Sequence, residues 1–366
     1  MSLLKIENVK TKERYVRYEF ILTILYFILM IIGYFAVKSA TLNSYLEGTD
    51  QRQLLFYIVG IISFIIILIL PERTIKTFIP ILFFAIVLSL ILVLIIGDET
   101  KGARRWLDIG SFGIQPSEFF KLFLILYLSK ILTDSSKTNY YLVSLLTVLS
   151  AGLIYIQPDL GTTLIVFFIW IVFTFLSGKF EVLWKTLVFS GVAISPLMFL
   201  LMKDYQRARI VGFIFPTLYS DFSYNTTQSI RAIGSGGISG TGFMNGYMNL
   251  GNFVPEDHTD FIISVIGEEF GFIGIFSVIF VYFLIIWRLY KGYKMSYDIF
   301  WKYFYAGSSF LIFFHVFENI GMNLGIMPVT GIPLPLISSG GSTILTYSLL
   351  FGLAVKGMML NKNLKR

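Results

Sequence analysis

The chain has 366 residues, of which 56% are hydrophobic, only 14% are charged and 37 are phenylalanine. Soluble domains hold roughly 45–50% apolar and 25% charged residues, so this composition excludes an ordinary soluble protein and indicates one embedded in lipid. The absence of cysteine excludes a disulfide framework, a thiolate metal site and a cysteine nucleophile. Any chemistry must therefore come from carboxylates, amines and hydroxyls.

A series of apolar stretches approaches the roughly 17–25 residues that a membrane-spanning helix needs. They cover Phe20–Val37, Leu54–Leu70, Phe78–Ile96, Phe119–Leu132, Tyr140–Ile156, Thr163–Leu176, Leu187–Met202, Phe261–Trp287, Phe304–Met322 and Ile344–Leu360. The sequence therefore predicts an all-α integral membrane protein of about ten transmembrane helices, formed by a single polytopic domain over residues 1–366. The first stretch is too long for the core of a cleaved signal peptide and is expected to remain as an anchor.

Basic residues predict the orientation of these helices. With both termini in the cytoplasm, most of the 29 lysine and arginine residues fall in cytoplasmic segments, as the positive-inside rule requires. This distribution accounts for the net charge of +7 without a nucleic-acid partner. The longer connections then lie outside: 98–117, 323–342 and a large loop, 203–260, between the seventh and eighth helices. Because long loops on a rigid scaffold often carry function, the active face is expected to be extracytoplasmic.

The first outward loop contains Lys101, Arg104, Arg105 and Trp106. Arginine supplies forked donors that match phosphate oxygens, and an indole offers a flat face to a sugar ring, so these residues are candidate substrate ligands. The alternative is an interfacial tryptophan with arginines paired to lipid headgroups.

Charged residues also lie close to the ends of the predicted helices. Glu118 and Lys121 share one helix face and are expected to form a structural pair, since an unpaired charge in the membrane is costly. Asp159 lies in a tight break between two helices, where it either binds substrate or caps the following helix.

The large outward loop contains the candidate catalytic acid. Arg209, Gln228 and Arg231 are candidate substrate ligands, and a glycine run over 234–242 follows without the Gly-Lys-Ser/Thr ending of a nucleotide P-loop. Asp260 stands at the outer mouth of the eighth helix, where it is open to water yet partly desolvated. Its alternative role is that of a helix N-cap.

The two histidines are interpreted as hydrogen-bonding residues. His258 has no second imidazole nearby for a metal site, so it is a candidate substrate contact within a loop network. Glu268, at the start of the eighth helix, is expected to be structural. His315, Glu318 and Asn319 lie deep in the ninth helix, where they either hydrogen-bond one another or line a path.

The last outward loop, 323–342, is rich in proline and glycine and includes the candidate ligands Ser338 and Ser342. Such a sequence predicts a rigid re-entrant shape, which is tolerated at membrane depth only against protein or a cavity.

Five motifs occur together in one order, and this combination resembles the SEDS family of bacterial cell-wall proteins over nearly the whole chain. They lie at 102–121, 157–162, 228–242, 255–268 and 319–342. Within the family, segments 252–256, 319–322 and 328–331 resemble the elongation (RodA) branch more than the division (FtsW) branch. Ser339 departs from the pattern, since the family usually has tyrosine before the paired glycines.

The resemblance implies a peptidoglycan glycosyltransferase that joins the disaccharide units of lipid II with loss of undecaprenyl pyrophosphate. Making a β linkage from an α-linked donor requires inversion, so a base must take the proton of the attacking hydroxyl, and Asp260 is the candidate. The outward cations would stabilise the departing pyrophosphate. No metal ligand set is predicted, although a Mg²⁺ or Mn²⁺ ion bridging pyrophosphate to a carboxylate is left open.

The resemblance also implies partners and a location. The partners would be lipid II, the nascent glycan strand, a class B penicillin-binding protein with transpeptidase activity, and other membrane proteins of the elongation complex. The location would be the bacterial cytoplasmic membrane. A lipid II flippase, an FtsW-like division polymerase and a scaffold that only recruits partners are the alternatives.

Overall fold

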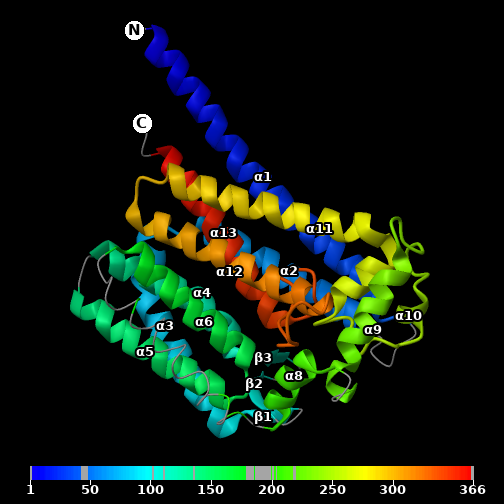
Figure 1. Ribbon diagram of the computed structural model, residues 1–366. Helices are drawn as coiled ribbons and strands as arrows, with labels where there is room; N and C mark the ends of the chain where they lie inside the picture. The colour runs from blue at the N-terminus through cyan, green and yellow to red at the C-terminus, as the bar shows by residue number, and fades with distance from the viewer. Residues whose placement is uncertain are drawn as a thin grey trace.

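The structure is a computed structural model, and it describes residues 2–42, 48–100, 103–109, 112–134, 137–178, 204–216 and 220–363, with the isolated positions 185, 199 and 202. Long helices lying side by side form most of the molecule (Figure 1). They are α1 (Ser2–Ala40), α2 (Thr49–Ile69), α3 (Glu72–Ile96), α4 (Pro116–Asp134), α5 (Lys137–Ile156), α6 (Leu160–Leu176), α11 (Ile262–Met295), α12 (Ile299–Asn323) and α13 (Gly341–Asn363).

These helices coincide with the predicted spans, apart from the seventh, at 187–202, which lies outside the described residues except for two isolated positions. Within the described ranges, six helices are long and apolar enough to cross a membrane, namely α1, α2, α3, α5, α11 and α13, and α6 is a shorter apolar helix. The chain is therefore an all-α, multi-pass membrane protein. The total of about ten spans stays a prediction.

Burial separates central helices from lipid-facing ones. Some 72% of the apolar window of α13 is buried, against 22% for α2 and for α3. α13 packs against α1, α2 and α4, whereas α2 and α3 expose rows of isoleucine and leucine, such as Ile58 and Ile62. In lipid these exposed apolar rows need no further partner, which accounts for the high hydrophobic content.

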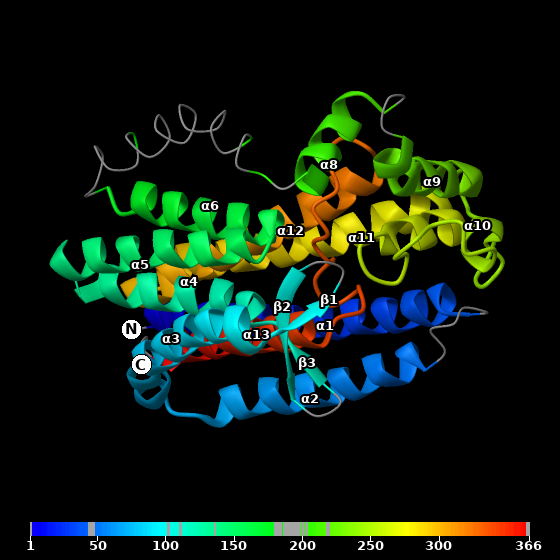
Figure 2. The same ribbon diagram turned by 90° about the horizontal axis from the view of Figure 1, so that it is seen from below.

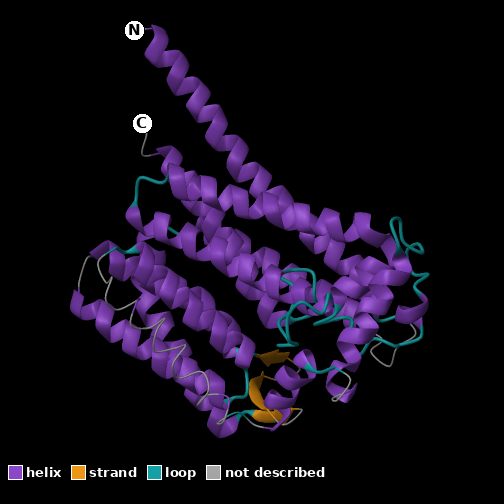
Figure 3. Ribbon diagram, viewed as in Figure 1, coloured by secondary structure: helices purple, strands orange, loops and turns teal. Residues whose placement is uncertain are grey.

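A small antiparallel sheet interrupts the helical pattern at 98–114. It consists of β1 (Asp98–Thr100), β2 (Ala103–Ile109) and β3 (Phe112–Ile114), with β2 in the middle. Asp98 pairs with Trp106, and Leu107 pairs with Ile114. The sheet joins the end of α3 to the start of α4 (Figure 3). The sequence had predicted only a loop here.

The predicted loop 203–260 also contains helices: α8 (Asp204–Ile214), α9 (Ser220–Gly236) and α10 (Tyr247–Leu250). They lie together at one end of the bundle (Figure 2). α9 packs along α11 and also contacts α12.

Close backbone packing explains the glycines that follow α9. A Cβ added at Gly236 would lie 2.0 Å from the carbonyl oxygen of Gly267, and one at Gly240 would lie 2.1 Å from that of Glu269. α11 is kinked at Gly271, whose φ of 64° favours glycine. The glycine run therefore serves the contact between this loop and α11 rather than an anion-binding cradle.

The segment between α12 and α13 runs back into the bundle, as the re-entrant prediction requires. Ile332, Leu334, Leu336 and Ile337 are at most 2% exposed. Side chains of the long helices satisfy the backbone of this irregular segment: Tyr57 Oη donates to Leu336 O (2.7 Å), and Tyr282 Oη donates to Pro335 O (2.5 Å). Buried carbonyls need such partners, so the segment is fixed in place.

Candidate active site

Asp260 lies just before α11 and faces the re-entrant segment. Its backbone oxygen accepts hydrogen bonds from Nδ2 of Asn319 (2.9 Å) and of Asn323 (3.0 Å), both on α12. Its carboxylate lies beside Gly331, where an added Cβ would be 3.2 Å from Oδ2. The N-cap of α11 is Phe261, so the structure does not give Asp260 the N-cap position that was the alternative. The carboxyl group is half-buried at the mouth of the helix.

Direct contacts join the residues before Asp260 to the re-entrant segment. Ser338 Oγ donates to Thr259 O (2.6 Å) and accepts from Leu334 N (2.8 Å). Ser339 N donates to His258 O (2.9 Å). Ser338 was predicted to bind substrate, and in the structure its hydroxyl fastens two segments together.

The structure places the two arginines of the first loop, both predicted to bind phosphate, in different surroundings within β2. Arg105 Nε donates to Gln157 O (2.8 Å) and its Nη2 donates to Pro158 O, so this guanidinium fixes the break before α6. Arg104 is exposed. Successive strand residues point to opposite sides, which explains why two adjacent arginines differ. Lys101 lies outside the described residues.

The structure gives Asp159 the capping role that was one of its two alternatives. Its Oδ1 accepts from Thr162 N (3.2 Å), and its Oδ2 accepts from Gln115 Nε2 (3.2 Å). Gln115 N in turn donates to Oγ of Ser342 (2.9 Å). Asp159 and Ser342 therefore connect the sheet region with α6 and α13, while their predicted contact with substrate stays a prediction.

The predicted pair of Glu118 and Lys121 is present and fully buried, with Oε1 and Nζ 2.7 Å apart. Lys121 Nζ also lies 3.0 Å from His315 Nε2, and Thr343 Oγ1 donates to Glu118 Oε2 (3.3 Å). The charges thereby link α4, α12 and α13. Glu318, only 1% exposed, lies near this cluster, and within the described residues its Oε2 has no hydrogen-bond partner.

Other predicted ligands lie around α8 and α9. Arg209 Nη1 donates to Val329 O (3.3 Å), two residues before Gly331. Gln228 is buried in α9, and Arg231 is exposed on the same helix. Arg209 is thus the cation that these contacts bring closest to the segment facing Asp260.

His258 and Glu268 both have protein partners. His258 Nδ1 lies 3.5 Å from Oδ1 of Asp257, and burial raises the pKa of that carboxyl although the histidine opposes the shift. Glu268 accepts the backbone N–H groups of Met248 (2.7 Å) and Asn249 (2.9 Å), which matches its expected structural role. Within the described residues no three His, Asp or Glu side chains gather to hold a metal ion.

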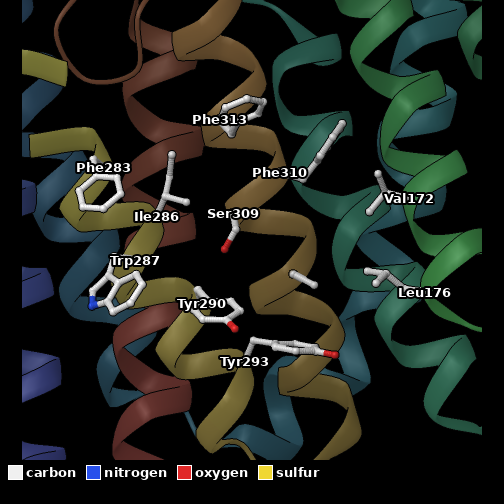
Figure 4. Close-up of a pocket in the computed structure, with 11 residues that line it drawn as sticks. Val172, Leu176, Phe283, Ile286, Trp287, Tyr290, Tyr293, Ser309, Phe310 and Phe313 are labelled. Atoms are coloured by element: carbon white, nitrogen blue, oxygen red, sulfur yellow. The ribbon is translucent and has the colours of Figure 1, made fainter. Parts of the chain in front are cut away.

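Two apolar grooves open toward lipid. One, of 490 Å³, lies between α6, α11 and α12 and is lined by Trp287, Tyr290 and Phe313 among others (Figure 4). On α11 this groove begins at Phe283. That residue is 21 residues beyond Ile262, which places the groove roughly 30 Å along the helix from its outer end. The second, of 570 Å³, lies between α1 and the outer part of α11 and includes Phe35 and Ile266. Only the second is near Asp260.

Asn323 and Gly331 were not predicted from the sequence as parts of the site. Asn323 follows Asn319 by four residues, so both amides lie on one face of α12, and this spacing could have identified the pair. Gly331 could not be identified, because its importance comes from a side chain far away in the sequence.

Similar proteins identify the family of this chain. A family model described as cell cycle protein, covering FtsW, RodA and SpoVE, matches residues 14–362. The peptidoglycan glycosyltransferase MrdB of Escherichia coli is 33% identical over 341 residues, covering 91% of this chain and 92% of the relative. The probable peptidoglycan glycosyltransferase FtsW of Francisella salina is 32% identical over 381 residues, covering 98% and 94%.

Solved structures are similar as well. A chain from work on "Structural coordination of polymerization and crosslinking by a peptidoglycan synthase complex" has a TM-score of 0.77 and 29% identity, covering 93% of this chain and 97% of its own length. The rod shape determining protein RodA of Thermus thermophilus has a TM-score of 0.70 and 29% identity, covering 92% and 95%. The protein belongs to the SEDS family, that of FtsW, RodA and SpoVE.

Proposed function

We propose that this bacterial membrane protein is the peptidoglycan glycosyltransferase of cell elongation, which polymerises lipid II and releases undecaprenyl pyrophosphate. The observation that carries this proposal is the arrangement of Asp260, a half-buried carboxylate whose backbone is held by two asparagines and whose side chain faces a fixed segment. The names of the relatives, and of MrdB above all, support the reaction and the elongation role.

Asp260 would act as the general base. In an inverting transfer, the acceptor hydroxyl attacks the anomeric carbon in line with the departing pyrophosphate, and the carboxylate takes the proton of that hydroxyl. A free aspartate, with a pKa near 4, is a weak base. Gly331 leaves room beside Oδ2 for the reacting hydroxyl.

Arg209 would stabilise the charge that develops on the leaving pyrophosphate. Its Nη1 donates to Val329 O, which places the guanidinium near Gly331. Arg105, in contrast, already donates to the carbonyls of residues 157 and 158. A fixed guanidinium can donate two parallel hydrogen bonds to phosphate oxygens. Arg104 and Arg231, which are exposed, would guide the anionic donor toward the site.

The groove between α1 and α11 would receive the polyprenyl chain. Its lining is apolar, and Ile266 is six residues beyond Asp260, or roughly 9 Å along α11. The active face would be extracytoplasmic with both termini inside. A class B penicillin-binding protein would crosslink the strands that this protein makes, and other elongation-complex proteins would bind nearby.

The test is polymerisation of purified lipid II by the protein reconstituted with its penicillin-binding partner, in the presence of moenomycin to silence contaminating polymerases. Asp260→Asn should fold normally and lose activity, because the amide cannot accept the proton. Asp134→Asn, at an exposed position at the end of α4, is the matched control and should retain activity.

Strand synthesis by Asp260→Asn at the wild-type rate would exclude the general-base role. If even the wild type makes no polymer while lipid II crosses the bilayer, the flippase alternative replaces the polymerase. Two of the polar residues that such a transporter would use make contacts inside the bundle, since His315 lies beside Lys121 and Glu269 accepts a hydrogen bond from Ser39.

A further inference from the structure

A further pocket lies beside the turn Ser339–Gly341 at the end of the re-entrant segment. It has a volume of 230 Å³ and is enclosed by the outer end of α2, by Trp106 and Gly113 of the sheet, and by the turn Ser339–Gly341. This is below the roughly 300–1,000 Å³ of pockets for drug-sized ligands, so it has room for about one ring. No step of the proposed reaction uses it.

The pocket contains a buried acceptor with no partner. Gln53, 1% exposed, donates from Nε2 to Tyr57 Oη (2.8 Å) and Ser338 O (3.3 Å), while its Oε1 has no hydrogen-bond partner among the described residues. An unpaired buried amide oxygen destabilises the folded protein, and a ligand that donates a hydrogen bond to it would remove that cost. The ligand must supply a hydrogen, so an O–H or amide N–H fits and a phosphate anion does not.

An aromatic wall stands beside this acceptor. Trp106 is half-buried, and a Cβ added at Gly113 would lie only 3.1 Å from its Cε3, so the indole packs closely against the backbone of β3. Indole faces cover the apolar C–H side of a sugar, and Arg52 at the exposed rim can donate to sugar oxygens. A flat wall, a buried acceptor and a peripheral donor together match a hydroxylated, amide-bearing ring.

Hydrogen bonds link the turn that lines the pocket to the residues before the candidate base, Asp260. Ser339, which lines the pocket, donates from its backbone N–H to His258 O, and the preceding Ser338 donates to Thr259 O, so both bond to the residues immediately before Asp260. From this geometry we infer that the pocket is a sugar subsite that holds an N-acetylhexosamine ring of the glycan adjacent to the reacting ring. The inference rests on the proposed glycosyl transfer, and it gives Trp106 and Gln53 a role in binding rather than in chemistry.

Two variants test the subsite from different walls. Trp106→Ala removes the stacking face. Gly340→Val fills the pocket, and its backbone permits this because an added Cβ would meet only Thr343, at 3.4 Å. Gly152→Val is the matched control, since its Cβ would have no neighbour within 4 Å and the position is exposed on α5. Thr49→Trp fills the pocket from α2 should Gly340→Val fail to fold.

Binding is measured by calorimetry in nanodiscs on the Asp260→Asn background, with an N-acetylglucosamine tetrasaccharide and with lipid II as separate probes. Both pocket variants should weaken binding of at least one probe roughly two- to tenfold, the range expected for loss of one ring contact, and Gly152→Val should not. In the active protein they should raise KM for lipid II more than they lower kcat.

The two probes distinguish the source of the sugar. Weakened tetrasaccharide binding assigns the subsite to the growing strand, and weakened lipid II binding alone assigns it to the donor. Wild-type affinity for both probes in both variants would overturn the subsite and leave the polymerase proposal intact. Absence of polymerisation by the wild type, with sugar binding still lost in the variants, would instead overturn the polymerase proposal.

Discussion

The two asparagines that hold Asp260 should be strongly coupled. Asn319 donates to Asp260 O and to Ile332 O, and Asn323 donates to Asp260 O. Asn323→Ala removes one of the two asparagine donors to Asp260 O and also the bond from Nδ2 to Asn319 O, while Ser229 keeps the backbone oxygen of residue 323 as acceptor. At about 0.5–1.5 kcal/mol for each hydrogen bond, this change should cost about 1–3 kcal/mol. Asn319→Ala also removes the asparagine donor to the buried Ile332 O, and this loss should cost about 1–3 kcal/mol.

In the double variant, both asparagine donors to Asp260 O are gone. Each single variant keeps one asparagine bonded to this carbonyl, so the double change should exceed the sum of the single changes by about 0.5–3 kcal/mol, the range for residues that share one hydrogen-bond network. The assay is a double-mutant cycle on thermal unfolding in detergent, with polymerisation rates measured in parallel. Additive losses of stability would refute the shared-acceptor reasoning, as would a double variant that keeps wild-type activity.

Three further outcomes follow from the structure. Lys121→Met should cost about 3–5 kcal/mol because it leaves Glu118 buried without its cation, and adding Glu118→Gln should restore part of this loss in thermal unfolding. Gly271→Ala should destabilise the protein by about 1–3 kcal/mol or more, because φ is positive and the new Cβ would lie 2.5 Å from Gly240 N, whereas Gly152→Ala should be neutral or slightly stabilising. Burial raises the folded-state pKa of Asp257 above its ordinary value of 3.8, so the folded state binds the extra proton and stability falls as pH rises through the raised pKa. Asp257→Asn should remove this decline, seen as a flatter dependence of the unfolding midpoint on pH above about 4.

The long helices could be predicted because charge-poor runs in lipid have almost no other stable form. The sheet at 98–114 could not, because its strands are only three to seven residues long and show no sustained alternation of apolar and polar residues. Because the sheet was not predicted, the different roles of the two arginines in it were not predicted either. Without the strand, nothing distinguished Arg104 from Arg105, whose side chains lie on opposite sides of β2.

Asp260 could be located from the sequence because it directly precedes a long apolar run. Its surroundings could not, since Gly331 and Asn323 approach it only through the return of the segment after α12. The contacts of Ser338 were also not predictable from the sequence, because its hydroxyl holds the loop through residues that lie elsewhere in the chain, while its predicted contact with substrate stays a prediction.

The fixed re-entrant segment bears on the choice between polymerase and transporter. Tyr57, Tyr282 and Asn319, from three different helices, donate to three successive parts of its buried backbone. A transporter that alternates access past this segment would have to break these bonds in each cycle, and each buried carbonyl left unpaired would cost about 1–3 kcal/mol. A polymerase gains from the same rigidity, because in-line attack requires the base and the acceptor hydroxyl to stay within hydrogen-bond distance. The arrangement that holds Gly331 against Asp260 is therefore better suited to chemistry at a fixed outer site than to moving a lipid across the bundle.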